Sequence, residues 1–187
     1  MTNETSPSVG TMIAQSRDVL TSRDVATFEK YERSGTLTNA VIYVAIAAAI
    51  TGVFGLGQGL SGFLSGIIST LLGFVIFTYL VYWLGKQRGG TGTFDEVAYT
   101  FALFWGPIAV IVGVGTLLLA ITIIGIPLIP LWLIFGLVAN VYFASLAARS
   151  STNLQETGKV WTTLIMAFLG TMLFQIVITA ITGVGRP

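Results

Sequence analysis

The chain has 187 residues, of which 54% are hydrophobic and 9% charged, and its formal net charge is +1. A water-soluble domain needs more charge to cover its surface, so this composition indicates a protein covered by lipid. The absence of cysteine and histidine excludes disulfides, thiolate nucleophiles and the usual zinc or haem ligands, and no basic cluster is dense enough for nucleic acid.

The N-terminal 36 residues are polar and lack the early apolar run of a secretory signal peptide. From Met12 to Tyr31, hydrophobic residues recur at helical spacing among basic ones. The pattern predicts an amphipathic helix or helix pair that lies in the cytoplasmic membrane interface, or an ordinary solvated helix packed against the membrane domain. The basic residues of this region are Arg17, Arg23, Lys30 and Arg33.

Two uncharged stretches, Leu37–Gly85 and Val97–Ala148, are each more than twice as long as the about 20 residues of one membrane-spanning helix. Each stretch therefore predicts a helical hairpin. We place the first turn within the glycine-rich segment Gly52–Gly62 and the second at Gly125–Pro130, because glycine follows helix ends and proline is accepted in a first helical turn. A last uncharged stretch, Val160–Gly185, predicts one further span.

The predicted fold is all-α, a polytopic membrane protein with a five-transmembrane-helix bundle over 37–185 and a cytoplasmic N-terminal tail over 1–36. With the N-terminus inside and the C-terminus outside, eight of the nine Lys and Arg residues fall on the cytoplasmic side. The predicted spans are about 38–56, 60–84, 94–121, 127–148 and 160–183. Aromatic residues near the cytoplasmic helix ends suit the headgroup layer, namely Tyr43, Tyr82, Trp83, Tyr99 and Trp161.

Small residues recur at every fourth position of the second, fourth and fifth spans, which favours close helix packing in lipid. Asn140 and Gln175 are the strongest polar side chains within the spans. At about 1.5 Å of rise per residue they lie on the order of 10 Å apart in depth. They indicate either hydrogen bonds between helices or a polar path for a solute or ion. No charged residue lies deep within a span, which disfavours ion-coupled pumps.

The charged loop between the two hairpins leads into a well-marked helix start. Thr93 and Glu96 have the spacing of a capping box, and Asp95 suits the positive end of the helix dipole. Further along, Gly106 and Pro107 predict a kink near the middle of the span. The glycines of the loop lack the rest of a phosphate-binding motif and predict a tight hinge instead.

This stretch also resembles a known family. A glycine-rich loop, then GTFDE opening a helix with a proline just past an aromatic cluster, within five closely spaced spans, resembles the Yip family, named for members that interact with Ypt/Rab small GTPases. The resemblance extends from about Val19 through the last span and is sharpest over Gly90–Pro107. It departs at Ser22–Arg23, where a proline is common in the family. The short loops are most similar to a bacterial member, whose location would be the cytoplasmic membrane.

The resemblance implies a non-enzymatic scaffold or adaptor of membrane trafficking, with the bilayer and a protein of unknown identity as partners; homo-oligomer formation stays open. No side chains are paired at catalytic spacing. Candidate contacts on the cytoplasmic face are Phe28, Arg33, Arg88, Gly90, Thr93, Phe94, Asp95 and Glu96. The alternative is a small channel, solute transporter or lipid-handling protein with Asn140 and Gln175 along its path.

The segments Ser34–Val41 and Thr91–Ala98 resemble each other, and each opens a hairpin from the cytoplasmic side. This similarity predicts either a parallel duplication of hairpins or two helix starts that share capping chemistry.

Overall fold

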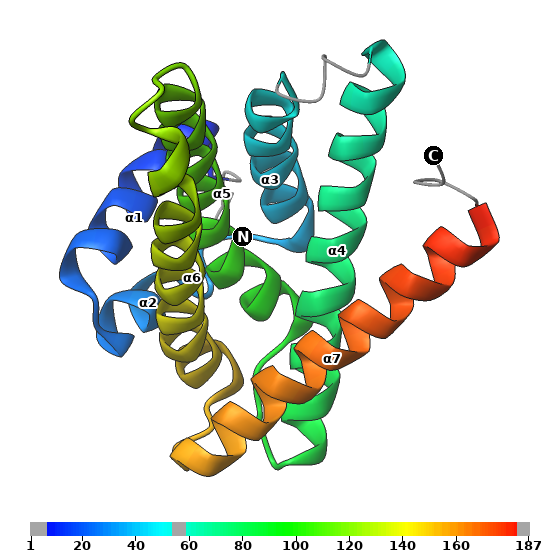
Figure 1. Ribbon diagram of the computed structural model, residues 1–187. Helices are drawn as coiled ribbons and strands as arrows, with labels where there is room; N and C mark the ends of the chain where they lie inside the picture. The colour runs from blue at the N-terminus through cyan, green and yellow to red at the C-terminus, as the bar shows by residue number, and fades with distance from the viewer. Residues whose placement is uncertain (1–6, 54–58, 183–187) are drawn as a thin grey trace.

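The computed structural model of the chain describes residues 7–53 and 59–182, which form helices joined by short links (Figure 1). The helices are α1 Val9–Ser22, α2 Val25–Tyr31, α3 Leu37–Gly52, α4 Gly59–Gln87, α5 Phe94–Ala120, a 3-10 turn Ile126–Leu128, α6 Ile129–Thr152 and α7 Thr157–Thr182. Within the described residues, four helices are long and apolar enough to cross a membrane, and α3 is a shorter apolar helix. The protein is therefore an all-α integral membrane protein.

The helices of the bundle run between two ends (Figure 1). We call one end the charged end. It carries the α4–α5 and α6–α7 links, and the described charged residues of the long helices lie in or beside these links. The opposite, apolar end carries the turn between α5 and α6. Of the predicted first turn, Gly52–Gly62, the central residues 54–58 are outside the described residues.

Two helices of the bundle start with capping boxes. At α5 the Thr93 hydroxyl accepts from the Glu96 amide, and the Glu96 carboxylate accepts from the Thr93 amide, which confirms the predicted box. At α3 the same exchange joins Thr36 and Asn39. The two similar segments thus share capping chemistry, since each satisfies amides that a helix start leaves without intrahelical partners.

The polar stretch between α6 and α7 is more helical than the sequence indicates. We expected α6 to end near residue 148, and it continues to Thr152, while α7 begins at Thr157 rather than near 160. The reason is that the polar residues at the end of α6 are buried against the bundle. The hydroxyls of Ser151 and Thr152 donate to the carbonyls of Ala147 and Ala148, four residues back, so they need no water.

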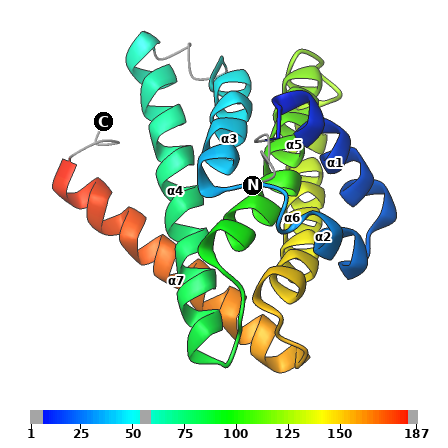
Figure 2. The same cartoon turned by 180° about the vertical axis from the view of Figure 1, so that it is seen from behind.

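The core lies toward the charged end, and α5 is its central helix. Aromatic side chains dominate it: Phe74 and Trp105 pack edge to face at 5.5 Å between ring centroids, and Phe28 and Phe104 at 6.3 Å. Gly106 brings α5 close to α3, because a Cβ there would already touch Tyr43 at 3.4 Å. Pro107 follows within α5, whose ribbon changes direction between its ends (Figure 2).

The N-terminal region forms a pair of helices that packs on the outer side of α5 and α6 (Figure 2). Met12, Val19 and Phe28 are buried in this contact. Two tyrosines expected in the headgroup layer are buried instead, because α1 covers them. The Tyr43 hydroxyl is 3.0 Å from the Ser16 Oγ, and the Tyr99 hydroxyl donates to the Gln15 Oε1 at 2.6 Å.

Candidate functional site

Polar side chains from three parts of the chain meet near the charged end, in a cluster that we call the polar junction: Glu32, Arg33, Asp95, Glu96 and Ser150. The Ser150 hydroxyl donates to Glu32 Oε2 at 2.8 Å. The Arg33 Nε lies 3.3 Å from Glu96 Oε1 and 3.7 Å from Glu32 Oε1. The junction therefore joins the α2–α3 link to the start of α5 and the end of α6.

Glu32 is the buried acid of the junction, with 6% of its surface exposed. Burial raises the pKa of its carboxyl above the ordinary value, while the hydrogen bond from Ser150 acts in the opposite direction. Arg33, by contrast, has 78% of its side chain exposed. A partner at this face would therefore meet the guanidinium and not the buried acid.

Asp95 connects the two capped helix starts. Its Oδ1 accepts from the backbone amide of Leu37, the first residue of α3, at 2.7 Å. A carboxylate is well suited to that place, because the amides at a helix start are unpaired and carry partial positive charge. Asp95 thus stabilises the start of α3 from the first turn of α5.

The glycine loop before α5 is docked and not free. The Thr91 amide donates to the Thr152 carbonyl at 3.1 Å. A Cβ on Gly90 would lie 2.8 Å from that same carbonyl oxygen, and a Cβ on Gly92 would overlap the Ser151 carbonyl oxygen. The glycines therefore allow two backbones to touch, whereas the sequence indicated a hinge.

The predicted contact residues of the cytoplasmic face have separate surroundings. Phe28 has 0% exposure and packs on Phe104, so its assignment as a surface contact is wrong: it anchors α2 instead. The Phe94 ring packs between Tyr79 and Tyr82. The Arg88 guanidinium donates to the Leu84 carbonyl and to the Met166 sulfur. Of the predicted set, Arg33, Asp95 and Glu96 come together in the polar junction, with Thr93 beside them in the cap of α5.

Two members of the junction, Glu32 and Ser150, were not predicted. The sequence does place Glu32 next to Arg33, a pair that could have drawn attention to it. Ser150 gave no signal, because a serine in a polar stretch is expected in a solvated loop.

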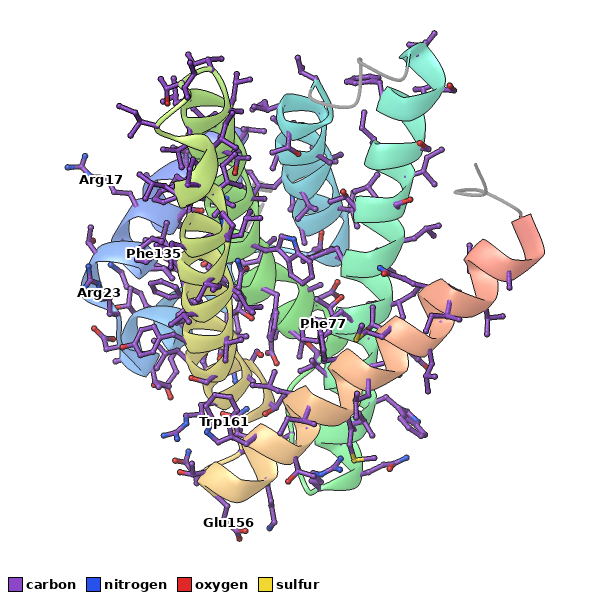
Figure 3. The ribbon with its side chains drawn as sticks, in the orientation of Figure 1. Arg17, Arg23, Phe77, Phe135, Glu156 and Trp161 are labelled. Atoms are coloured by element: carbon purple, nitrogen blue, oxygen red, sulfur yellow. The ribbon has the colours of Figure 1, made fainter. Side chains whose placement is uncertain are left out.

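A second candidate site is a groove of about 1340 Å³ bordered by α4 and α7 on one side and by α5 and α6 on the other, which we call the long groove. Asn140 and Gln175 both line it, and so does Phe77, which Figure 3 labels near the centre of the molecule. The Asn140 Nδ2 donates to the Gly136 carbonyl of its own helix at 2.9 Å. That bond is not the interhelical one considered from the sequence.

The stripes of small residues lie in two different surroundings. Ala144 of α6 and Ala167 of α7 are buried in the half of the bundle nearer the charged end. On α4 the small residues Ser69 and Thr70, in the half nearer the apolar end, line the long groove. Figure 1 shows α7 leaning away from α6 toward the apolar end. Small residues therefore serve packing in one half of the bundle and border open space in the other.

Within 7–53 and 59–182, no group of acidic side chains is placed to hold a metal ion. The chain was compared with known proteins. The family model for the Yip1 domain matches residues 17–180. No curated protein and no solved structure matched the chain. Since the matched segment includes every helix from the middle of α1 onward, the chain belongs to the Yip1 domain family, whose members are generally non-enzymatic proteins linked to membrane trafficking.

Proposed function

We propose that this protein is a non-enzymatic scaffold or adaptor that acts through its charged end, and that this end faces the cytoplasm. One observation carries the proposal. All described Asp, Glu, Lys and Arg residues lie on α1 and α2, in the link to α3, or in and beside the α4–α5 and α6–α7 links. The described residues of the α5–α6 turn, at the apolar end, carry no charge. Such asymmetry orients a membrane protein with its basic side inside.

In this proposal α3 is a fifth span and residues 37–185 form the transmembrane domain. Residues 1–36 form the cytoplasmic tail with its amphipathic segment, of which α1 turns its apolar side to lipid and α2 faces the cytoplasm. The 16 residues of α3 rise about 24 Å at 1.5 Å each, less than the about 30 Å of a hydrocarbon core. A bilayer thins locally around a short helix at modest cost.

The partner surface is the exposed side of α2 and of the link that follows it. Asp24, Glu29, Lys30 and Arg33 are exposed there, while Phe28 holds α2 on the bundle. Charges of both signs on a fixed helix suit a protein surface of complementary charge.

Crosslinking in native membranes followed by co-purification tests the proposal. We expect a partner whose recovery falls severalfold when Glu29→Lys and Arg33→Glu reverse the exposed charges. Lys159→Glu is the matched control, because Lys159 is a partly exposed basic residue in the first turn of α7, paired with Glu156. If every recovered partner is insensitive to the first pair, the adaptor function is ruled out.

The long groove favours a second candidate, a protein that handles lipids or carries a small solute. Two amide side chains border a largely apolar groove that reaches 1340 Å³, which is the mixture that ligand sites show. Flux of ions, solutes or labelled lipid across reconstituted vesicles would support it if Asn140→Leu or Gln175→Leu abolished the flux. Phe135→Leu is the control, since Phe135 projects outward from α6 (Figure 3). Vesicles without any such flux would exclude this candidate.

A further inference from the structure

A smaller groove of about 520 Å³ lies between α1 and the pair formed by α3 and α5. We call it the flank groove. Its lining is aliphatic along most of its length and includes Ile13, Ile50 and Ile111, which are 56%, 46% and 51% exposed. Aliphatic side chains exposed side by side on a membrane protein face lipid chains and not water.

Arg17 is the one charged residue among those that line the flank groove. None of the ion pairs in the described part of the chain includes Arg17 or Arg23. The acid next to Arg17 is engaged elsewhere, because Asp18 accepts from the Tyr31 hydroxyl at 2.7 Å and from Lys30 at 3.3 Å. Figure 3 shows both arginines projecting from the outer edge of the molecule.

The exposed side of α1 therefore changes character along the helix. Val9 and Ile13 in its first half are apolar, whereas Arg17 in its second half and Arg23 at its C-cap are basic. A glycerophospholipid has the same order, with apolar acyl chains joined to an anionic phosphate group. Guanidinium groups bind phosphate with charge-assisted hydrogen bonds and tolerate partial desolvation.

We propose that the flank groove binds one anionic glycerophospholipid, with an acyl chain along Ile13, Ile50 and Ile111 and the phosphate at Arg17. Arg23 lies nearer the charged end and adds positive potential there. A second copy of the chain is a poorer occupant, because its apolar helix faces bring no acid to neutralise Arg17. The proposal rests on the membrane location alone and is independent of the adaptor function.

Native mass spectrometry of the detergent-purified protein, titrated with phosphatidylglycerol or phosphatidylcholine, tests this site. We expect one phosphatidylglycerol retained in preference to phosphatidylcholine. Arg17→Gln should weaken that binding roughly fivefold, the effect of one basic side chain near an anionic membrane surface. Lys159→Gln removes a charge from the first turn of α7, which does not line the flank groove, and should leave binding unchanged. Ile50→Trp fills the groove, keeps Arg17 and should weaken the binding of both lipids.

Other results would overturn the proposal. Equal losses of phosphatidylglycerol binding in Arg17→Gln and Lys159→Gln would mean general charge attraction. Full retention of the lipid in Ile50→Trp would mean that its acyl chain does not lie in the groove. Glycerol phosphate that competes as well as the lipid would indicate a phosphate site, and a dimer mass lost in Ile50→Trp would indicate a second copy. If Arg17→Gln does not purify, Arg17→Lys, which should retain phosphatidylglycerol, and Ile50→Trp decide the question.

Discussion

Asp95 stabilises a helix to which it does not belong, since its carboxylate accepts from the first amide of α3. We expect Asp95→Ala to lower the free energy of unfolding by about 1 kcal/mol, the usual value of a lost helix cap. Asp95→Asn is the matched control, because its amide oxygen still accepts while the charge is gone. Thermal unfolding in detergent measures both. Equal losses would show that the charge in the first turn of α5 matters and the bond to Leu37 does not.

Glu32 should make stability depend on pH. Burial raises the folded-state pKa of its carboxyl above the ordinary value of 4.5, so the folded protein holds this proton more tightly than the unfolded chain. Its contribution to stability is therefore greatest below the ordinary pKa and declines as pH rises through the raised value. Glu32→Gln keeps an acceptor for Ser150 and should remove that decline. Melting temperatures from about pH 4 to about pH 8 check this, and parallel profiles would contradict it.

The docked glycine loop makes a prediction at the level of helix ends. In Gly92→Ala the new methyl group meets the Ser151 carbonyl oxygen, so the start of α5 and the end of α6 must separate. We expect the free energy of unfolding to fall by roughly 1–3 kcal/mol, as for other overpacked sites. Gly158→Ala in the first turn of α7 has open space around the new Cβ and should cost nothing. A Gly92→Ala protein as stable as the parent would show that the loop is mobile.

The α1–α2 pair depends on one aromatic anchor. Phe28→Ala removes a wholly buried ring, a change that costs about 3–5 kcal/mol in other proteins. The pair should then open locally, and trypsin should cleave after Arg23 and Lys30 more than about tenfold faster. Phe174→Ala truncates an exposed ring of α7 and serves as the control. Unchanged cleavage in Phe28→Ala would mean that other contacts hold the pair.

Local signals predicted the elements well and their ends less well. The capping box of Thr93 and Glu96 depends on four neighbouring residues, so the sequence contains all of it. The end of α6 depends instead on residues that are far away in the sequence. Ser150 is polar, and only the packing of α2 against α6 buries it and gives it Glu32 as a partner. Burial of Phe28 likewise depends on Phe104, which no nearby pattern indicates.

The arrangement of the whole molecule predicts which links are reached from outside a cell. The chain has no native cysteine, so single cysteines report position. Ile123→Cys, in the turn at the apolar end, should react with an impermeant maleimide in intact cells. Glu156→Cys, in the α6–α7 link (Figure 3), should react only after permeabilisation. The reverse pattern would place the charged end outside.

At this scale the sequence predicted the family and five apolar helices, of which the described structure has four long enough to cross a membrane and a shorter one. It did not predict the grooves, because their walls come from segments far apart in the chain. The flank groove needs α1 to lie along α3 and α5, and periodicity in α1 shows an apolar face without showing what that face meets. The long groove depends on the lean of α7, which no local pattern specifies.

The bond between Asp95 and Leu37 also depends on the order in which the chain is synthesised. The ribosome makes the carboxylate 58 residues after the amide that it accepts from. The first hairpin therefore emerges before its carboxylate partner exists, and the Leu37 amide gains that partner only when α5 has been synthesised and has docked. The start of α3 in the first hairpin is therefore fully capped only after the second hairpin has folded against it.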